Sequence, residues 1–136
     1  IKKFIVFLVV VIIGIQFIPI ERTNPPVQSD IDAPSDVKAI LKKACYDCHS
    51  NETNWVWYTK VAPMSFLAVK DVNDGRKHLN FSEWGSYTNK TEKMMDEIWE
   101  EVREEKMPPW QYRIVHSEAK LTQEEKNILR NWAVNK

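Results

Sequence analysis

The chain has 136 residues with 19 basic and 19 acidic side chains, so its formal net charge is zero. This length fits one domain with an appendage, and the balanced charge excludes a broadly basic nucleic-acid-binding protein and an acidic disordered tail. Two cysteines are too few for a disulfide-rich scaffold. The neutral average hides two unlike parts, because no acidic residue precedes Glu21.

A strongly apolar stretch lies near the N-terminus. Residues 4–18 carry no charge, with Lys2 and Lys3 in front of them and Pro19 shortly after. As a helix the stretch measures about 25 Å, the short end of what spans a bilayer. Because small residues are missing before a cleavage point, we favour an uncleaved membrane anchor over residues 1–20 rather than a cleavable signal peptide. The leading lysines predict that the rest of the chain lies outside the cytoplasm.

The remainder divides into a linker and a domain. Residues 21–34 hold three prolines and no apolar period, which predicts an extended linker reaching up to about 40 Å at ~3 Å per residue. Residues 35–136 form the expected domain. Apolar residues at helical spacing predict four helices in this domain. The first runs from residue 35 to the two cysteines at 45 and 48, the second covers 63–75 and the third covers 91–106. The last begins at the capping box at 122–125. No segment alternates like a strand, so we expect an all-α domain.

The residues that carry chemistry follow the first helix of this domain. They read Cys45-Tyr46-Asp47-Cys48-His49, the C-x-x-C-H pattern of covalent haem attachment. Cysteines three residues apart on one helical turn point the same way, so both thiols reach the vinyl groups on one porphyrin edge. The histidine that follows then lies under the iron as its proximal ligand. The pattern predicts one covalently attached haem c.

Three other readings of these cysteines remain. A C-x-x-C redox site expects a thioredoxin-like strand before it, whereas this pattern follows a helix. A zinc site needs four ligands, and His78 and His116 are distant in sequence from the cluster. A plain disulfide would leave His49 without a role.

The second axial ligand of the iron is predicted less directly. Met107 stands where the third helix ends, and the two prolines after it stiffen the chain. We therefore expect Met107 to be the distal ligand, with His116 as the next candidate and an open or water-bound iron as the third. The other candidates have ordinary packing or solvated roles: Met64, Met94, Met95 and His78.

Aromatic and acidic residues are abundant outside the anchor. All six tryptophans follow residue 20, and flat aromatic rings pack well against haem, although they serve equally well in an ordinary core. The run from Asp96 to Glu105 holds six carboxylates. We read it as a solvated helix face, with docking of a basic partner as the alternative.

The chain resembles the single-haem class I c-type cytochromes. The resemblance rests on the C-x-x-C-H element, Met107-Pro-Pro and the capped final helix. More closely, the chain is similar to the bacterial haem-binding domain family of small envelope proteins over about residues 35–134. This similarity rests on the run that starts at Cys45 and on three later runs: Val61-Ala-Pro-Met-Ser-Phe, Asp74-Gly-Arg and Leu79-Asn-Phe-Ser-Glu-Trp. The resemblance implies a small cytochrome c-like domain, thioether bonds at both cysteines and a proline carbonyl, nearest at Pro63, that accepts a hydrogen bond from His49.

These observations predict an electron carrier rather than an enzyme. The expected protein is a membrane-anchored monohaem cytochrome c that passes single electrons between redox or respiratory partners on the periplasmic side of the bacterial inner membrane, either free or as a subunit of a larger membrane complex. The alternative is a haem peroxidase or small-ligand sensor, which needs an open distal iron site. Nucleic acid is not an expected partner.

Overall fold

The computed structural model describes residues 1–134, so the last two residues of the expected domain lie outside it. Its elements in chain order are α1 (Lys2–Gly14), η1 (Ile15–Phe17), α2 (Ser35–Ala44), α3 (Tyr46–His49), η2 (Trp57–Lys60), α4 (Met64–His78), η3 (Trp84–Tyr87), α5 (Thr91–Arg103), α6 (Trp110–Val115), η4 (Ser117–Ala119) and α7 (Gln123–Val134). The described residues form helices and no strand beyond one isolated bridge, from Ser29 to Glu83. The all-α prediction is confirmed.

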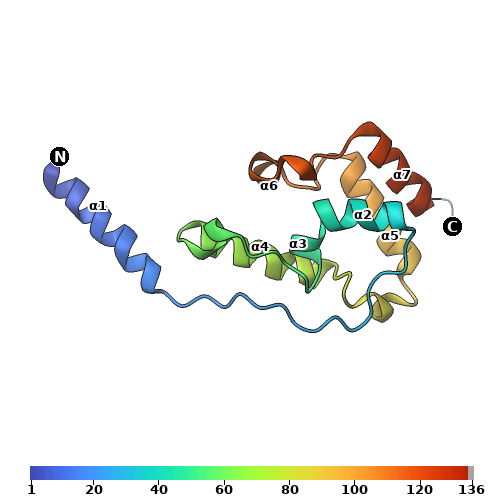
Figure 1. Ribbon diagram of the computed structural model, residues 1–136, viewed down its shortest axis with the longest axis horizontal. Helices are drawn as coiled ribbons and strands as arrows, with labels where there is room; N and C mark the ends of the chain where they lie inside the picture. Colours follow the sequence, from blue (N-terminus) through green and yellow to red (C-terminus); the bar gives the residue numbers. More distant parts are fainter. Residues whose placement is uncertain (135–136) are drawn as a thin grey trace.

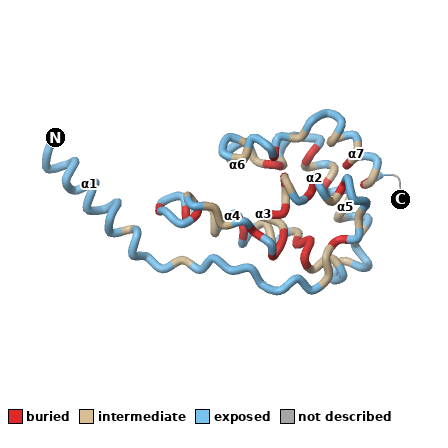
Figure 2. Tube along the Cα trace, viewed as in Figure 1, coloured by how far each residue is buried: buried red, intermediate tan, exposed pale blue. Residues whose placement is uncertain are grey.

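The N-terminal helix projects away from the rest of the molecule, and its side chains are exposed along nearly its whole length (Figures 1 and 2). It is shorter than the sequence predicted. The α-helix covers 13 residues and ends at Gly14, and after a 3-10 turn the backbone becomes extended at Ile18, just before Pro19. None of the helices within residues 1–134 is long and apolar enough to cross a membrane, so the expected transmembrane helix over residues 1–20 is not found.

The main core lies where α2, α5 and α7 pack together (Figure 1). The apolar face predicted for the first domain helix is confirmed, and the matching faces of the other two helices meet it. The buried residues of the three helices are Val37, Ile40, Leu41, Ala44, Ile98, Val102, Leu129 and Ala133. Burying each of the larger aliphatic side chains contributes about 1.5–3 kcal/mol, so this face supplies much of the domain's stability.

Two helix ends differ from the sequence prediction. The helix expected over 63–75 begins at Met64 and continues through Gly75 to His78. A side chain at Gly75 would collide with the carbonyl oxygen of Cys48, so the glycine lets α3 pack directly on α4 rather than ending the helix. The helix expected over 91–106 ends at Arg103, because Glu105 adopts a left-handed backbone conformation with φ 57°.

The linker over residues 21–34 contains no helix and is fastened to the domain. The backbone N–H of Ser29 donates to the carbonyl of Ser82 at 3.0 Å, and Trp84 N–H donates to the carbonyl of Ser29 at 2.9 Å. Further along, Ile31 is only 1 % exposed and belongs to the main core. From α4, Arg76 donates to the carbonyl of Thr23 at 2.9 Å. The segment therefore runs along the domain surface, as Figure 1 shows.

Candidate functional site

The two cysteines lie on one turn at the junction of α2 and α3. Cys45 ends α2 with a non-helical φ of −126°, and the chain then forms the single helical turn of α3 over Tyr46–His49. The backbone N–H groups of Cys48 and His49 both donate to the carbonyl of Cys45, at 3.2 and 2.9 Å. Both thiols are free and partly buried. The arrangement on one turn is the one that the sequence spacing predicted.

The acidity of these thiols separates the site from a redox dithiol. Burial raises the pKa of Cys45 to about 12, with a smaller contribution from Cys48. Burial also raises the pKa of Cys48 to about 12, helped by the carboxylates of Asp71 and Asp47. Catalytic C-x-x-C thiols have a lowered pKa, because the thiolate is the reactive form. This pair stays protonated at neutral pH, which disfavours a thioredoxin-like role.

The imidazole of His49 is fixed from one side. Its Nδ1 lies 3.0 Å from the carbonyl oxygen of Leu79, which can only accept, so Nδ1 carries the proton and Nε2 keeps its lone pair. Burial lowers the pKa of His49, although the hydrogen bonds to the carbonyls of Leu79 and Gly75 oppose this shift. The ring is therefore neutral, as a metal ligand must be. The partner implied by resemblance, Pro63, is wrong: the carbonyl that holds the ring is that of Leu79.

The segment that holds His49 is itself anchored by buried polar groups. Asn80 donates through Nδ2 to Asn51 Oδ1 at 2.9 Å and accepts the backbone N–H of Ser82 at 3.0 Å. The hydroxyl of Ser82 accepts the N–H of Asn51 at 2.9 Å, and these three residues are at most 3 % exposed. Phe81 N–H donates to the carbonyl of His49 at 2.7 Å. The network thus locks the residues after the motif onto the segment that orients its imidazole.

The sequence analysis does not predict this network, because residues 76–90 lie between the two helices predicted over 63–75 and 91–106 and show no helical or strand period of their own. The available signal was compositional. Asn51 follows the motif closely, and Asn80 and Ser82 flank Phe81 in a run that the family resemblance already included. Amides and hydroxyls beside a large aromatic residue fit a buried hydrogen-bonded turn better than a solvated loop.

Met107 is partly buried at the turn after α5. Its backbone N–H donates to the carbonyl of Glu101 at 3.1 Å, which ties it to the end of that helix. The chain then enters α6, a six-residue helix that the sequence analysis did not predict, with Pro109 at its N-cap. No described contact joins the Met107 side chain to the cysteine motif, so its role as the distal ligand stays a prediction.

His116, the next candidate for the distal ligand, has both ring nitrogens engaged. Nε2 makes a hydrogen bond with the hydroxyl of Tyr58, and Nδ1 lies 2.9 Å from a carboxylate oxygen of Glu118. The ring also stacks on Tyr112, with centroids 4.2 Å apart. Because no ring nitrogen is left over, the structure favours a bridging role for His116 between η2 and α6. His78 is exposed at the end of α4.

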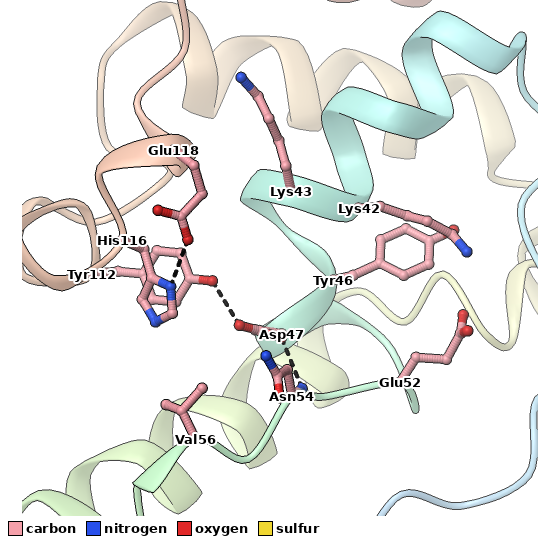
Figure 3. Close-up of a pocket in the computed structure, with 10 residues that line it drawn as sticks. All are labelled: Lys42, Lys43, Tyr46, Asp47, Glu52, Asn54, Val56, Tyr112, His116 and Glu118. Carbon is pink, nitrogen blue, oxygen red and sulfur yellow. Dashed lines mark hydrogen bonds and ion pairs between the residues drawn. The ribbon is translucent and has the colours of Figure 1, made fainter. Parts of the chain in front are cut away.

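A polar cavity of about 440 Å³ opens beside the motif, on the side of Tyr46 and Asp47 (Figure 3). Asp47 accepts the hydroxyl of Tyr112 at 2.7 Å and the backbone N–H of Asn54 at 2.9 Å. Burial and then the bond to Asp47 raise the pKa of Tyr112. His116 is the one candidate haem ligand among the residues that line this cavity; Cys45, Cys48, His49 and Met107 are not among them.

Five of the six tryptophans divide between the core and the surface. Trp84, Trp99 and Trp132 pack against the main core, which is the ordinary use of a large aromatic residue. Large apolar side chains also remain exposed on η2, on the first half of α4 and on α6: Trp57, Val61, Met64, Leu67, Trp110, Ile114 and Val115. In Figure 1 these helices extend from α3 toward the same side of the domain. These are exposed apolar surfaces of the kind that a ligand or another surface can cover.

The acidic helix face carries mostly local ion pairs. Lys106 lies 2.6 Å from Glu104, Arg103 lies 3.4 Å from Glu100, and Lys93 lies 3.5 Å from Glu97. These pairs are exposed and within one helix region, as in a solvated surface. The arrangement favours the solvated-face interpretation of residues 96–105.

A haem-binding domain model matches residues 10–135. The chain belongs to the haem-binding domain family. No curated protein and no solved structure matches it.

The donor groups fit the cofactor that this family binds. Two protonated thiols stand on one turn, and beside them a neutral imidazole keeps one nitrogen lone pair. Within residues 1–134, no three or more histidine, cysteine, aspartate or glutamate side chains are grouped so that they could hold a bare metal ion. The family supplies the haem, and the neutral imidazole of His49 on α3 fits the place of a ligand to its iron.

Proposed function

We propose that this haem-binding protein carries one covalently attached haem c and passes single electrons between redox partners. The observation that carries the proposal is the hydrogen bond from His49 Nδ1 to Leu79, on the turn that also holds both free thiols. It leaves Nε2 as the ligand and fixes the plane of the ring. Bound haem iron supplies a one-electron couple, and histidine–methionine ligation favours electron transfer over oxygen chemistry.

Covalent attachment is tested by denaturing the holoprotein. With both Cys45 and Cys48 present, the haem stays with the polypeptide on a denaturing gel stained for haem. The double variant Cys45→Ala, Cys48→Ala loses its haem under the same conditions, while a Cys→Ala change at one position leaves one thioether. Free haem released from the unchanged protein would refute the covalent c-type assignment.

The proposal assigns the distal ligand to Met107. Support comes from its partly buried position at the end of α5 and from the two bonds that leave His116 no free nitrogen. Met107→Ala should open the iron, so that the reduced protein binds carbon monoxide at once and its midpoint potential falls. Met64→Ala is the matched control, because Met64 is 44 % exposed.

The same experiment separates a carrier from a peroxidase or ligand sensor. A carrier in its native form binds carbon monoxide slowly and shows reversible one-electron reduction. Fast carbon monoxide binding by the unchanged protein would assign it to the class with an open iron site. Identical spectra with and without Met107 would show that Met107 is not the distal ligand and would count against the carrier.

We further propose that the N-terminal segment attaches the domain to the outer face of a bacterial cytoplasmic membrane. The support is the uncharged, exposed stretch between Lys3 and Pro19 and the lysine pair before it. Attachment would hold the domain near membrane-bound redox complexes, as a free carrier or as a subunit. Cell fractionation tests this location, and recovery of the full chain in the soluble periplasmic fraction would refute it.

A further inference from the structure

A second cavity lies where the N-terminal segment meets the start of α4. It has a volume of about 280 Å³ and is lined by residues 15–20 and Arg22 on one side and by Lys60, Ala62 and Ser65 on the other. The site proposed for haem takes no residue from it. The cavity thus joins the apolar segment to the domain at one defined place.

Gln16 makes this junction specific. It is the one amide in the apolar stretch of residues 4–18. Its Nε2 donates to the carbonyl of Ala62 at 3.1 Å, and its Oε1 accepts the N–H of the same residue at 3.0 Å. A paired amide contact of this kind fixes direction as well as distance. The end of the N-terminal segment is therefore clamped to the turn between η2 and α4.

The charges at the cavity are of one sign. Arg22 and Lys60 are both exposed, and no aspartate or glutamate is among the lining residues. Within residues 1–134, no ion pair joins either cation to an acid. Two cations that face one cavity without a carboxylate attract an anion.

Apolar side chains surround the same junction. Phe17 is 82 % exposed at the end of the N-terminal segment, and Trp57 is 76 % exposed on η2. Val61, Met64 and Leu67 are 47, 44 and 53 % exposed on the adjoining turn and helix. Tryptophan beside aliphatic residues and flanking cations is the composition of a membrane–water interface.

We propose that this cavity binds the headgroup phosphate of an anionic phospholipid through Arg22 and Lys60, with Trp57 lying at the interface. The inference rests on the proposed membrane attachment. The Gln16 clamp then sets which face of the domain meets the lipid, because it holds η2 and the start of α4 at the end of the apolar segment. The exposed apolar patch around Met64 continues the lipid contact of that segment.

The test uses the full holoprotein in a neutral detergent and short-chain lipids titrated into it, with bound lipid counted by native mass spectrometry. The unchanged protein should bind phosphatidylglycerol more tightly than phosphatidylcholine. Replacing Arg22 and Lys60 by Gln should weaken phosphatidylglycerol binding about fivefold for each cation removed, because a cation near an anionic lipid contributes about 1 kcal/mol. The matched control is Lys90→Gln with Arg130→Gln, which removes the same charges from exposed positions elsewhere.

Two results would overturn the assignment. One is equal binding of phosphatidylglycerol by the unchanged protein and the Arg22, Lys60 double variant. The other is equally tight binding of glycerol phosphate, which has the anion without acyl chains and would show an anion site only. Haem attachment and midpoint potential should be the same in every variant, so a failure of the electron-transfer proposal appears separately.

Orientation is tested with brominated lipids in vesicles. Bromine quenches tryptophan at the interface, and the difference between the unchanged protein and Trp57→Phe reports Trp57 alone. Gln16→Leu keeps the segment apolar but removes the clamp, so vesicle binding should persist while quenching of Trp57 falls. Gln28→Leu is the control, because Gln28 is exposed and lies in the linker. Undiminished quenching in Gln16→Leu would refute the orienting role.

Discussion

Truncating Asn80 to alanine tests whether the buried polar network holds the site together. The amide of Asn80 bonds Asn51 Oδ1 at 2.9 Å and the N–H of Ser82 at 3.0 Å, and Asn51 and Ser82 are 3 % and 0 % exposed. Each buried partner left without a hydrogen bond costs about 1–3 kcal/mol. A water molecule entering the vacated space recovers part of this cost. We therefore expect Asn80→Ala to lower the free energy of unfolding by about 2–4 kcal/mol, a large share of a total near 5–15 kcal/mol.

Urea unfolding of the full holoprotein, followed by circular dichroism, measures this loss as a lower midpoint at unchanged slope. The control is Asn127→Ala, because Asn127 is exposed and only accepts a 3.2 Å bond from Gln123. That control should stay within about 0.5 kcal/mol of the unchanged protein. A loss below 1 kcal/mol for Asn80→Ala would refute the reasoning, since it would mean that the two orphaned groups find partners without cost.

Three further changes probe the same region. Burial lowers the pKa of His49 below its ordinary value of 6.5, so the unfolded chain binds a proton at a higher pH than the folded chain does. The haem-free protein should therefore have its full stability above pH 6.5 and lose stability as the pH falls below that value. A urea midpoint that stays constant between about pH 6.5 and 5, or that changes equally in His49→Gln, contradicts this. Gly75→Ala should cost about 1–2 kcal/mol in urea unfolding by forcing α3 off α4, whereas Gly14→Ala, with open space around it, should be neutral. Tyr112→Phe removes the 2.7 Å bond to Asp47 and should cost about 1–2 kcal/mol by the same assay, and an unchanged midpoint would show that α6 is not held through this bond.

The sequence was sufficient for the features that depend on local spacing. Val37, Ile40 and Leu41 recur at helical intervals, and the structure buries all three on one face of α2. The spacing of Cys45 and Cys48 likewise predicted a shared turn, which the structure contains. Both inferences needed only neighbours within about one or two helical turns.

Features that depend on distant partners could not be predicted in this way. The carbonyl that orients His49 belongs to Leu79, 30 residues later, and nothing in the spacing of the motif indicates it. A glycine late in a helical pattern usually marks a helix end, which is why the sequence predicts one at Gly75, yet this glycine makes room for the backbone of Cys48. The length of the N-terminal helix depends on where the backbone leaves helical geometry, at Ile18, which apolar composition alone does not determine.

The fastened linker has a consequence for how partners meet the domain. Because Arg76 holds the carbonyl of Thr23 and Ile31 is buried in the core, residues 23–31 cannot serve as a swinging arm. A domain on a long free arm samples a hemisphere and reaches a partner by its own motion. Under the membrane attachment proposed above, this domain would turn as a rigid body about the axis of its N-terminal segment and diffuse with it in the plane of the membrane. A partner would then have to present its docking face at a fixed height above the membrane surface.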